Sequence, residues 1–112
     1  MKEETKLSGH KRFYELLDKI AETHSRKNSD YSKKSDPLSN LKSSETYFEV
    51  PAWIGTAIRM SDKWERFTNL VKKRQRGEGP AVKDESIKDT LEDLAVYCLL
   101  EVILIEESEN NT

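Results

Sequence analysis

The stretch from Lys83 to Glu107 constrains the fold of this chain more than any other. Neither glycine nor proline interrupts it, and apolar side chains recur at intervals of three or four residues. That spacing predicts one long helix, which Asp84 can cap at its start. From Leu94 to Ile105 the helix is apolar on nearly all sides, apart from Tyr97 and Glu101. We therefore expect its second half to be buried on most sides.

Acidic residues mark the first half of the same helix. Glu85, Asp89 and Asp93 follow one another at steps of four, which places their carboxylates along one ridge. Like charges at that spacing repel, and a lone carboxylate is costly beside the apolar half of the helix. Hard divalent cations bind carboxylate oxygens, so the ridge predicts a site for Mg²⁺, with Mn²⁺ as a substitute. The alternative is an acidic face exposed to solvent.

Two further helices are predicted upstream. The first runs from a cap at Ser8 to about Arg26, with an ordinary amphipathic pattern. The second runs from Pro51, which suits a first helical turn, to about Arg74. Apolar residues of the second helix alternate steps of four and three and predict one buried face: Trp53, Ala57, Met60, Trp64, Phe67 and Val71. The short connection that follows favours antiparallel packing of the second and third helices.

Between these helices, residues 27–44 read KNSDYSKKSDPLSNLKSS, a composition typical of a loop. A loop this long in a compact domain is usually either functional or disordered. Because Tyr31, Leu38 and Leu41 can anchor it, we expect an ordered loop folded over a site, with a mobile surface linker as the alternative. Residues 45–50 are expected to form a short extended piece or a turn.

The composition bounds the class of protein. A chain of 112 residues predicts a single all-α domain, with three main helices, an ordered core of about 8–107 and flexible ends. Hydrophobic residues make up only 35% of the chain and charged residues 36%, a balance that favours completing the core as a homodimer or larger homo-oligomer. The formal net charge of −2 argues against general nucleic-acid binding.

Other sequence features predict where in the cell the protein is found. The single cysteine, Cys98, lies in the apolar helix and is expected to be an inert core thiol, so no disulfide framework is predicted. The first residues lack an apolar signal core, and the run from Leu94 to Ile105 is too short to span a bilayer. We therefore expect a soluble, cytoplasmic protein that does not bind membranes.

Cationic residues of the second helix form a second candidate constellation. Arg59, Lys63 and Arg66 project near one face, and arginine suits bidentate phosphate contacts while lysine supplies a point charge. In an antiparallel pair these cations can approach the acidic ridge. The alternative is an internal salt bridge between Arg59 or Arg66 and Asp89 or Asp93. Both interpretations hold if the site rests in a salt-bridged state without its ligand.

The loop supplies a third set of candidates: Lys27, Asn28, Asp30, Tyr31 and Asn40. Asparagine can read a base edge or a ribose, and tyrosine can stack on a base. Loops of this composition also occur without any ligand. The chain contains no nucleophile motif, glycine-rich phosphate loop or zinc-ligand spacing.

Four segments together resemble a known family: KNSDY (27–31), DPLSNL (36–41), IRMSDKWERFTNL (58–70) and DESIKDTLEDLAVY (84–97). They resemble the nucleotide modification associated domain, which is common in phage genomes and is similar to the all-α NTP pyrophosphohydrolases of the MazG-like group. The resemblance covers roughly residues 10 to 107. It implies an all-α oligomer that binds Mg²⁺ through acidic residues on two helices and cleaves a nucleoside triphosphate to the monophosphate and pyrophosphate.

The acidic signature of that group is E-E-x-x-E on one helix and E-x-x-D on a later one. Asp93 matches the final aspartate, while Thr90 stands where the preceding glutamate is expected and Asp89 is the nearest substitute. The second helix offers only Asp62 and Glu65, at a spacing of three. A nucleotide-binding protein that has lost or altered catalysis would show this pattern.

The favoured function is therefore Mg²⁺-dependent hydrolysis of a (deoxy)nucleoside triphosphate at the α–β linkage. The resemblance and the residue patterns assign the roles as follows: Mg²⁺ at Glu85, Asp89 and Asp93, with Asp62; phosphates at Arg59, Lys63 and Arg66; base or sugar at Asn28, Tyr31, Asn40 and Tyr97. Two alternatives remain open, a non-catalytic nucleotide-binding or nucleotide-sequestering protein of phage type and a structural protein-interaction module. A phage-encoded protein would act in the cytoplasm of the host cell.

Overall fold

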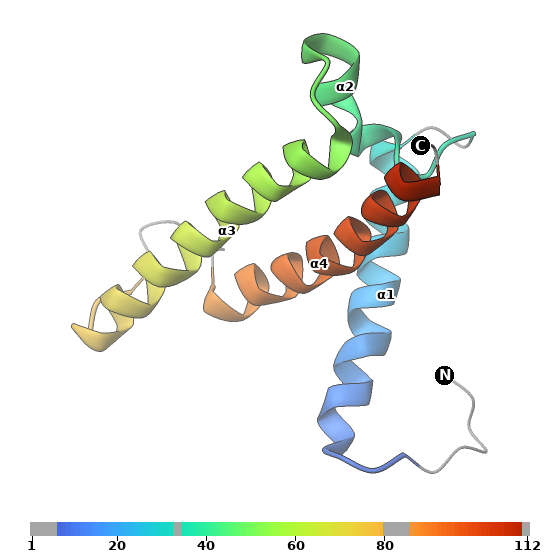
Figure 1. Cartoon of the computed structure of the whole chain (residues 1–112). Coiled ribbons are helices and arrows are strands. Elements are labelled where there is room, and N and C mark those ends of the chain that lie inside the picture. The colour runs from blue at the N-terminus through green and yellow to red at the C-terminus, as the bar shows by residue number, and fades with distance from the viewer. Residues whose placement is uncertain (1–6, 33–34, 80–85, 111–112) are drawn as a thin grey trace.

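The fold is known from a computed structural model, which describes residues 7–32, 35–79 and 86–110 (Figure 1). Within these residues the chain is helical and contains no strand, which confirms the all-α prediction. In chain order the elements are α1 (Lys11–Tyr31), a 3₁₀ turn η1 (Ser39–Leu41), α2 (Ser43–Phe48), α3 (Ala52–Gln75) and α4 (Ile87–Asn110).

Helix α1 is longer than its sequence predicts. It begins after His10, whose Nδ1 accepts a hydrogen bond from the Arg12 amide at 3.0 Å, so His10 and not Ser8 is the cap. It continues five residues beyond Arg26 and ends at Tyr31. The segment KNSDY is therefore the end of a helix and not the start of a loop. Its polar residues are poor helix formers, but neither glycine nor proline breaks the chain before Pro37.

The rest of the predicted loop forms short helices, and we call residues 35–50 the connector. Asp36 starts the first turn, because its Oδ1 accepts the Leu38 amide at 3.0 Å while its Oδ2 binds Lys42 Nζ at 3.0 Å. Where an extended piece or a turn was expected, residues 43–48 form α2. Glu49 ends this helix in the left-handed conformation with φ at 57°, which reverses the chain toward Pro51 and α3.

Helix α2 sits tightly against the start of α3. The Glu45 carboxylate accepts the Ala52 amide at 2.8 Å and so satisfies an N–H group in the first turn of α3. A side chain at Gly55 would place its Cβ 2.5 Å from Ser44 Oγ. Only glycine allows the two helices this close approach.

Helices α3 and α4 form the antiparallel pair that the short connection predicts. Ala52 at the start of α3 shares a buried cluster with Leu104 near the end of α4, together with Leu38 and Leu41 of the connector. Ser86 caps α4, because its Oγ accepts the Asp89 amide at 3.0 Å. The predicted cap, Asp84, lies outside the described residues. Helix α4 continues to Asn110, beyond the predicted end at Glu107.

The buried core of the chain is small, and this corrects three expectations. Among the described residues, the buried hydrophobic side chains are Leu38, Leu41, Ala52, Leu70 and Leu104. The predicted buried face of α3 is largely open, with Trp53 38% and Trp64 54% exposed. On α4, Leu99 and Val102 are more than half exposed, and Cys98 is an exposed thiol and not a core one.

The open packing has a simple cause. Helix α1 packs mainly against α4, so within the described residues much of the α3–α4 pair has no covering layer (Figure 1). The Cα radius of gyration is 16.6 Å, whereas a compact domain of this length has one of about 13 Å. A single copy of the chain therefore leaves much of its apolar surface in water.

Glu101 of α4 is an acidic side chain whose burial costs free energy that hydrogen bonds do not fully offset. Glu101 has one carboxylate oxygen that is buried and without a hydrogen-bond partner, and burial raises the pKa of this group above its usual range. A raised carboxyl pKa means that the folded chain binds the proton more tightly than the unfolded chain does. The charge of Glu101 therefore costs stability as pH rises through its unfolded and folded pKa values, and the cost is absent below them.

We expect Glu101→Gln to raise the free energy of unfolding at neutral pH by about 1 kcal/mol, because it removes a poorly solvated charge. The gain should vanish under acidic conditions, where the parent carboxyl is already protonated. Chemical denaturation of both proteins across the acid-to-neutral range measures this, with the exposed Glu106→Gln on the same helix as the matched control. An equal change in the two variants at every pH would contradict the assignment.

Candidate functional site

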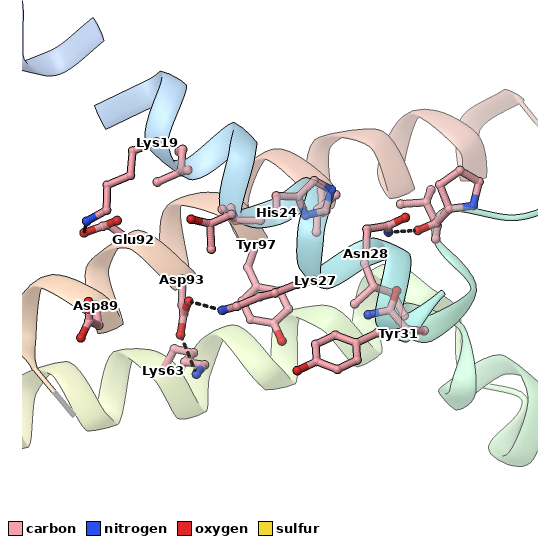
Figure 2. A pocket seen from close by; sticks show the side chains of 18 residues that line it. Lys19, His24, Lys27, Asn28, Tyr31, Lys63, Asp89, Glu92, Asp93 and Tyr97 are labelled. Atoms are coloured by element: carbon pink, nitrogen blue, oxygen red, sulfur yellow. Dashed lines mark hydrogen bonds and ion pairs between the residues drawn. The ribbon is translucent and has the colours of Figure 1, made fainter. Parts of the chain in front are cut away.

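A cavity of about 380 Å³ lies between α1 and α4, with the connector at one end and Lys63 of α3 on its floor (Figure 2). The cavity follows from two helix faces. Helix α1 presents residues at steps of three and four from Lys19 to Tyr31, and α4 does the same from Asp89 to Leu100. Because the two helices approach closely over only a short length, the polar side chains between them enclose space.

The structure gathers most of the sequence-predicted site residues around this one cavity. Those that line it are Lys27, Asn28, Tyr31, Asn40, Lys63, Asp89, Asp93 and Tyr97. They come from four different elements, α1, η1, α3 and α4, so only the tertiary fold brings them together.

Asp93 is the centre of the charged part of the cavity. Its Oδ2 accepts a hydrogen bond from Lys63 Nζ of α3 at 3.2 Å, and its Oδ1 accepts one from Lys27 Nζ of α1 at 3.4 Å (Figure 2). The salt bridge expected between α3 and the acidic ridge therefore exists, and Lys63 forms it with Asp93, whereas Arg59 contacts the connector. Nearby, Lys19 Nζ pairs with Glu92 at 3.1 Å.

Tyrosine and asparagine residues occupy the opposite part of the cavity. Figure 2 shows the Tyr31 ring projecting toward the side that carries Tyr97 and Lys63. Tyr31 is 65% exposed, whereas Tyr97 is half-buried. The ring of Tyr31 is therefore accessible at the mouth of the cavity, and that of Tyr97 forms part of its wall.

The asparagines hold the connector against α1. Asn28 Nδ2 donates to the Pro37 carbonyl at 2.5 Å and to Ser32 Oγ at 3.3 Å. Ser32 Oγ in turn donates to Asn40 Oδ1 at 2.6 Å. These bonds close one end of the cavity.

Other predicted site residues lie away from the cavity. Asp30 and Asp62 are exposed and do not line it; Asp62 immediately precedes Lys63, and a step of one residue turns a helix by about 100°. Arg59 Nη2 lies 3.5 Å from both the Asn40 carbonyl and Ser43 Oγ, so it braces the connector. Arg66 is exposed and does not line the cavity. Glu85 lies outside the described residues.

Sequence reasoning missed four polar residues of the cavity: Lys19, Thr23, His24 and Glu92. A signal for the first was present, since Lys19, Thr23 and Lys27 follow at steps of four and share one ridge of a helix. Glu92 lies three residues after Asp89, which also places it on the ridge that holds Asp89 and Asp93. The extension of α1 beyond Arg26 was needed to place Lys27 on the ridge of Lys19 and Thr23.

The described residues supply only part of the predicted metal site. Within the described ranges, no group of three or more histidine, cysteine, aspartate or glutamate side chains is close enough to hold a metal ion. Asp89 and Asp93 remain as the predicted ligands that line the cavity. A complete set would need oxygen atoms from a ligand, from water or from residues beyond the described ones.

Comparisons with models of protein families, with curated proteins and with solved structures found no match to this chain. The resemblance to the nucleotide modification associated domain therefore stays a prediction based on its motifs. No helix in the described part of the chain is long and apolar enough to cross a membrane.

The two kinds of aspartate in this region should differ in their effect on stability. Asp93→Asn should change the free energy of unfolding by less than about 1 kcal/mol, because its partly exposed ion pairs contribute little. Asp36→Ala should cost about 1–2 kcal/mol, because it removes both the acceptor of the Leu38 amide and the bridge that raises the pKa of Lys42. Urea unfolding of the two variants compares them directly. A larger loss in Asp93→Asn would make Asp93 a structural residue.

Proposed function

We propose that the cavity binds a (deoxy)nucleoside triphosphate. The observation that carries this proposal is the convergence of Lys27 and Lys63 on one carboxylate, inside a cavity in which Tyr31 and Tyr97 lie one helical turn beyond Lys27 and Asp93. Cations at one end and aromatic rings at the other match the phosphates and the base of a nucleotide. The volume of about 380 Å³ lies within the range of small-molecule sites, roughly 300–1,000 Å³.

The lysines are suited to exchange partners when an anionic ligand enters. Asp93 pairs with both Lys27 and Lys63 and offsets only one of their two positive charges, and the pairs are partly exposed, so separating them costs little. A phosphate group carries more charge and more acceptor oxygens than a carboxylate. It would therefore take over the two ammonium groups, while Asp93 is released to water or to a cation that accompanies the phosphates.

The base and sugar are proposed to bind at the tyrosine end of the cavity. Tyr31 is accessible to stack on a base, and Tyr97 offers a hydroxyl near the wall. Asn28 and Asn40 already hold the connector in place, so their remaining polar atoms would contact the ligand from fixed positions. A rigid end of this kind lowers the ordering cost of binding.

Hydrolysis at the α–β linkage is the second candidate function. Its support is the placement of Asp89, Glu92 and Asp93 along one wall of the cavity, together with the resemblance to pyrophosphohydrolases. Mg²⁺ bound with the triphosphate would supply charge neutralisation at the phosphates and help to generate an attacking water. Because the described residues do not complete a metal site, binding is the primary proposal and turnover the further one. The working form is proposed to be a cytoplasmic homodimer or larger homo-oligomer.

Titration with a nucleoside and its triphosphate, with and without Mg²⁺, tests the binding proposal. Tyr31→Ala should weaken affinity for both ligands by roughly 5- to 150-fold, on the scale of an aromatic–base stack. Tyr47→Ala is the matched control, because Tyr47 is 74% exposed on α2 and does not line the cavity. Equal affinities of the parent, Tyr31→Ala and Tyr47→Ala would remove Tyr31 from the site. A parent that binds no nucleotide under any condition would refute the proposed function.

The lysines and Asp93 make separate predictions. Lys63→Met should weaken triphosphate binding by roughly 10- to 100-fold and nucleoside binding little, because it removes a charge-assisted phosphate contact. The exposed Lys72→Met on the same helix is its control. Asp93→Asn should strengthen triphosphate binding in the presence of a chelator, because it frees both lysines, and should reduce any gain in affinity from Mg²⁺.

Product analysis by anion-exchange chromatography separates a hydrolase, which releases pyrophosphate, from a binding protein, which does not.

A further inference from the structure

Three lysines line the cavity within the described part of the chain, and Lys19 is the one that the proposed phosphate contacts leave unused. Its Nζ atom lies 3.1 Å from Glu92 Oε2, and the two side chains are 51% and 24% exposed. The other two lysines, Lys27 and Lys63, share Asp93. The cavity therefore holds two separate groups of cations, each paired with its own carboxylate of α4.

The two groups follow one another along the cavity. Figure 2 shows Lys19 and Glu92 on one side of Asp93 and Tyr31 on the other. Along α1, Lys19 lies eight residues before Lys27, a distance of about 12 Å, whereas Tyr31 lies one turn after Lys27. The order along the cavity is therefore the Lys19 pair, then the Asp93 group, then the tyrosine ring.

The charge of a ligand decides how many of these lysines it can engage. A phosphate monoester carries a charge of about −1.5 to −2 at neutral pH, which the ammonium groups of Lys27 and Lys63 can balance. Both lie next to the proposed place of the base. Each further phosphate of a longer chain adds negative charge that these two lysines do not balance, and Lys19 is the next lysine along the cavity.

We propose that Lys19 binds the terminal phosphate of the nucleotide and makes the cavity select triphosphates over monophosphates. The ligand then lies along α1, with its base at the connector end of the cavity and its last phosphate toward the first turns of α4. This inference rests on the proposed nucleotide site. It adds to that site the direction of the ligand and the residue that distinguishes its phosphate number.

Thr23 supports this direction of the ligand. It lies four residues after Lys19 and four before Lys27, on the same ridge of α1, and it lines the cavity. A threonine hydroxyl can donate a hydrogen bond to a phosphate oxygen. The ridge therefore presents three donors in a row to a phosphate chain that lies along it.

The Lys19–Glu92 pair is suited to open when a phosphate arrives. Because the pair is partly exposed, breaking it costs little. A phosphate carries more charge and more acceptor oxygens than a carboxylate, so it can displace Glu92 from the ammonium group. Glu92 itself repels the incoming phosphate, and it therefore lowers triphosphate affinity in the parent.

This opposition separates a ligand contact from a purely structural one. Lys19→Met and Glu92→Gln remove the same ion pair between α1 and α4. If the pair only holds the two helices together, both substitutions change ligand affinity in the same direction. If Lys19 binds phosphate, Lys19→Met weakens triphosphate binding and Glu92→Gln strengthens it.

Calorimetric titration of the parent and both variants tests the proposal. The ligands are the mono- and triphosphates of the four common deoxynucleosides, in a chelator so that Mg²⁺ does not balance the phosphate charge. Lys19→Met should lower triphosphate affinity roughly 10-fold and monophosphate affinity less than about 2-fold. Glu92→Gln should raise triphosphate affinity about 3-fold or more, whereas Lys63→Met should weaken both ligands.

Two exposed residues provide matched controls with the same change of charge. Lys11→Met lies on α1 and Glu106→Gln on α4, and neither residue lines the cavity. Both should keep the affinities of the parent for the mono- and the triphosphate. Circular dichroism checks that each variant is folded. If Lys19→Met does not fold, Glu92→Gln decides alone: a higher preference for the triphosphate supports the proposal, and an equal or lower one overturns it.

The possible failures can be told apart. Equal losses of mono- and triphosphate affinity in Lys19→Met, or no loss of either, would overturn the assignment of Lys19 while leaving the nucleotide site in place. Changes in the same direction in Lys19→Met and Glu92→Gln would make their ion pair a structural contact. A parent that binds none of the nucleotides refutes the proposed function, and this inference with it.

Discussion

The close contact between α3 and α4 is the constraint on which the rest of this structure depends. Small or compact side chains, Ala52 and Thr56 on α3 and Thr90 on α4, are the buried groups that allow the two helices to approach. Leu70 and Leu104 fill the two ends of the contact. The packed pair forms a layer with two flanks. One flank meets α1 and forms a polar cavity, and the other stays apolar and open.

The different character of the two flanks follows from how α1 meets α4. An apolar contact would exclude water and pull the helices together along their length, as it does between α3 and α4. The contact between α1 and α4 instead relies on ion pairs such as Lys19–Glu92 and Lys27–Asp93, which are long, partly exposed and individually weak. Space is therefore left between the helices, and the groups that line it keep their charges available to a ligand.

Much of this fold could be predicted from the sequence, and the exceptions have physical causes. The extent of α3, the antiparallel pairing and the all-α class follow from periodicity and from Gly77, which ends α3 with a φ of 76°. The end of α1 could not be predicted, because residues 27–31 have low helix propensity and are held by Asn28 and its distant partner Pro37. Helix α2 was missed for a similar reason, since its contact with Gly55 links residues far apart in the pattern.

The residue types of the candidate site could be predicted from the sequence, but the ion pairs between them could not. Residue types at helical steps brought Asp89, Asp93 and Lys63 into the prediction, and the fold places all three on one cavity. Lys27, and not Arg59, pairs with Asp93 because of the rotation of α3 and the added turn of α1. No local sequence pattern contains either of these features. Similarly, periodicity identified apolar faces correctly but could not tell whether the same chain or another one covers them.

Lys42 adds a polar link between two parts of the molecule that already share the buried cluster of Leu38, Leu41 and Leu104. Its ammonium group lies 3.0 Å from Asp36 and 3.7 Å from Glu107, and the Asp36 hydrogen bond raises its pKa further, so it stays charged throughout the physiological range. The connector that closes one end of the cavity is thereby tied to the last turns of α4. Because these ion pairs are partly exposed, the tie is weak, and it positions the connector without locking it in place.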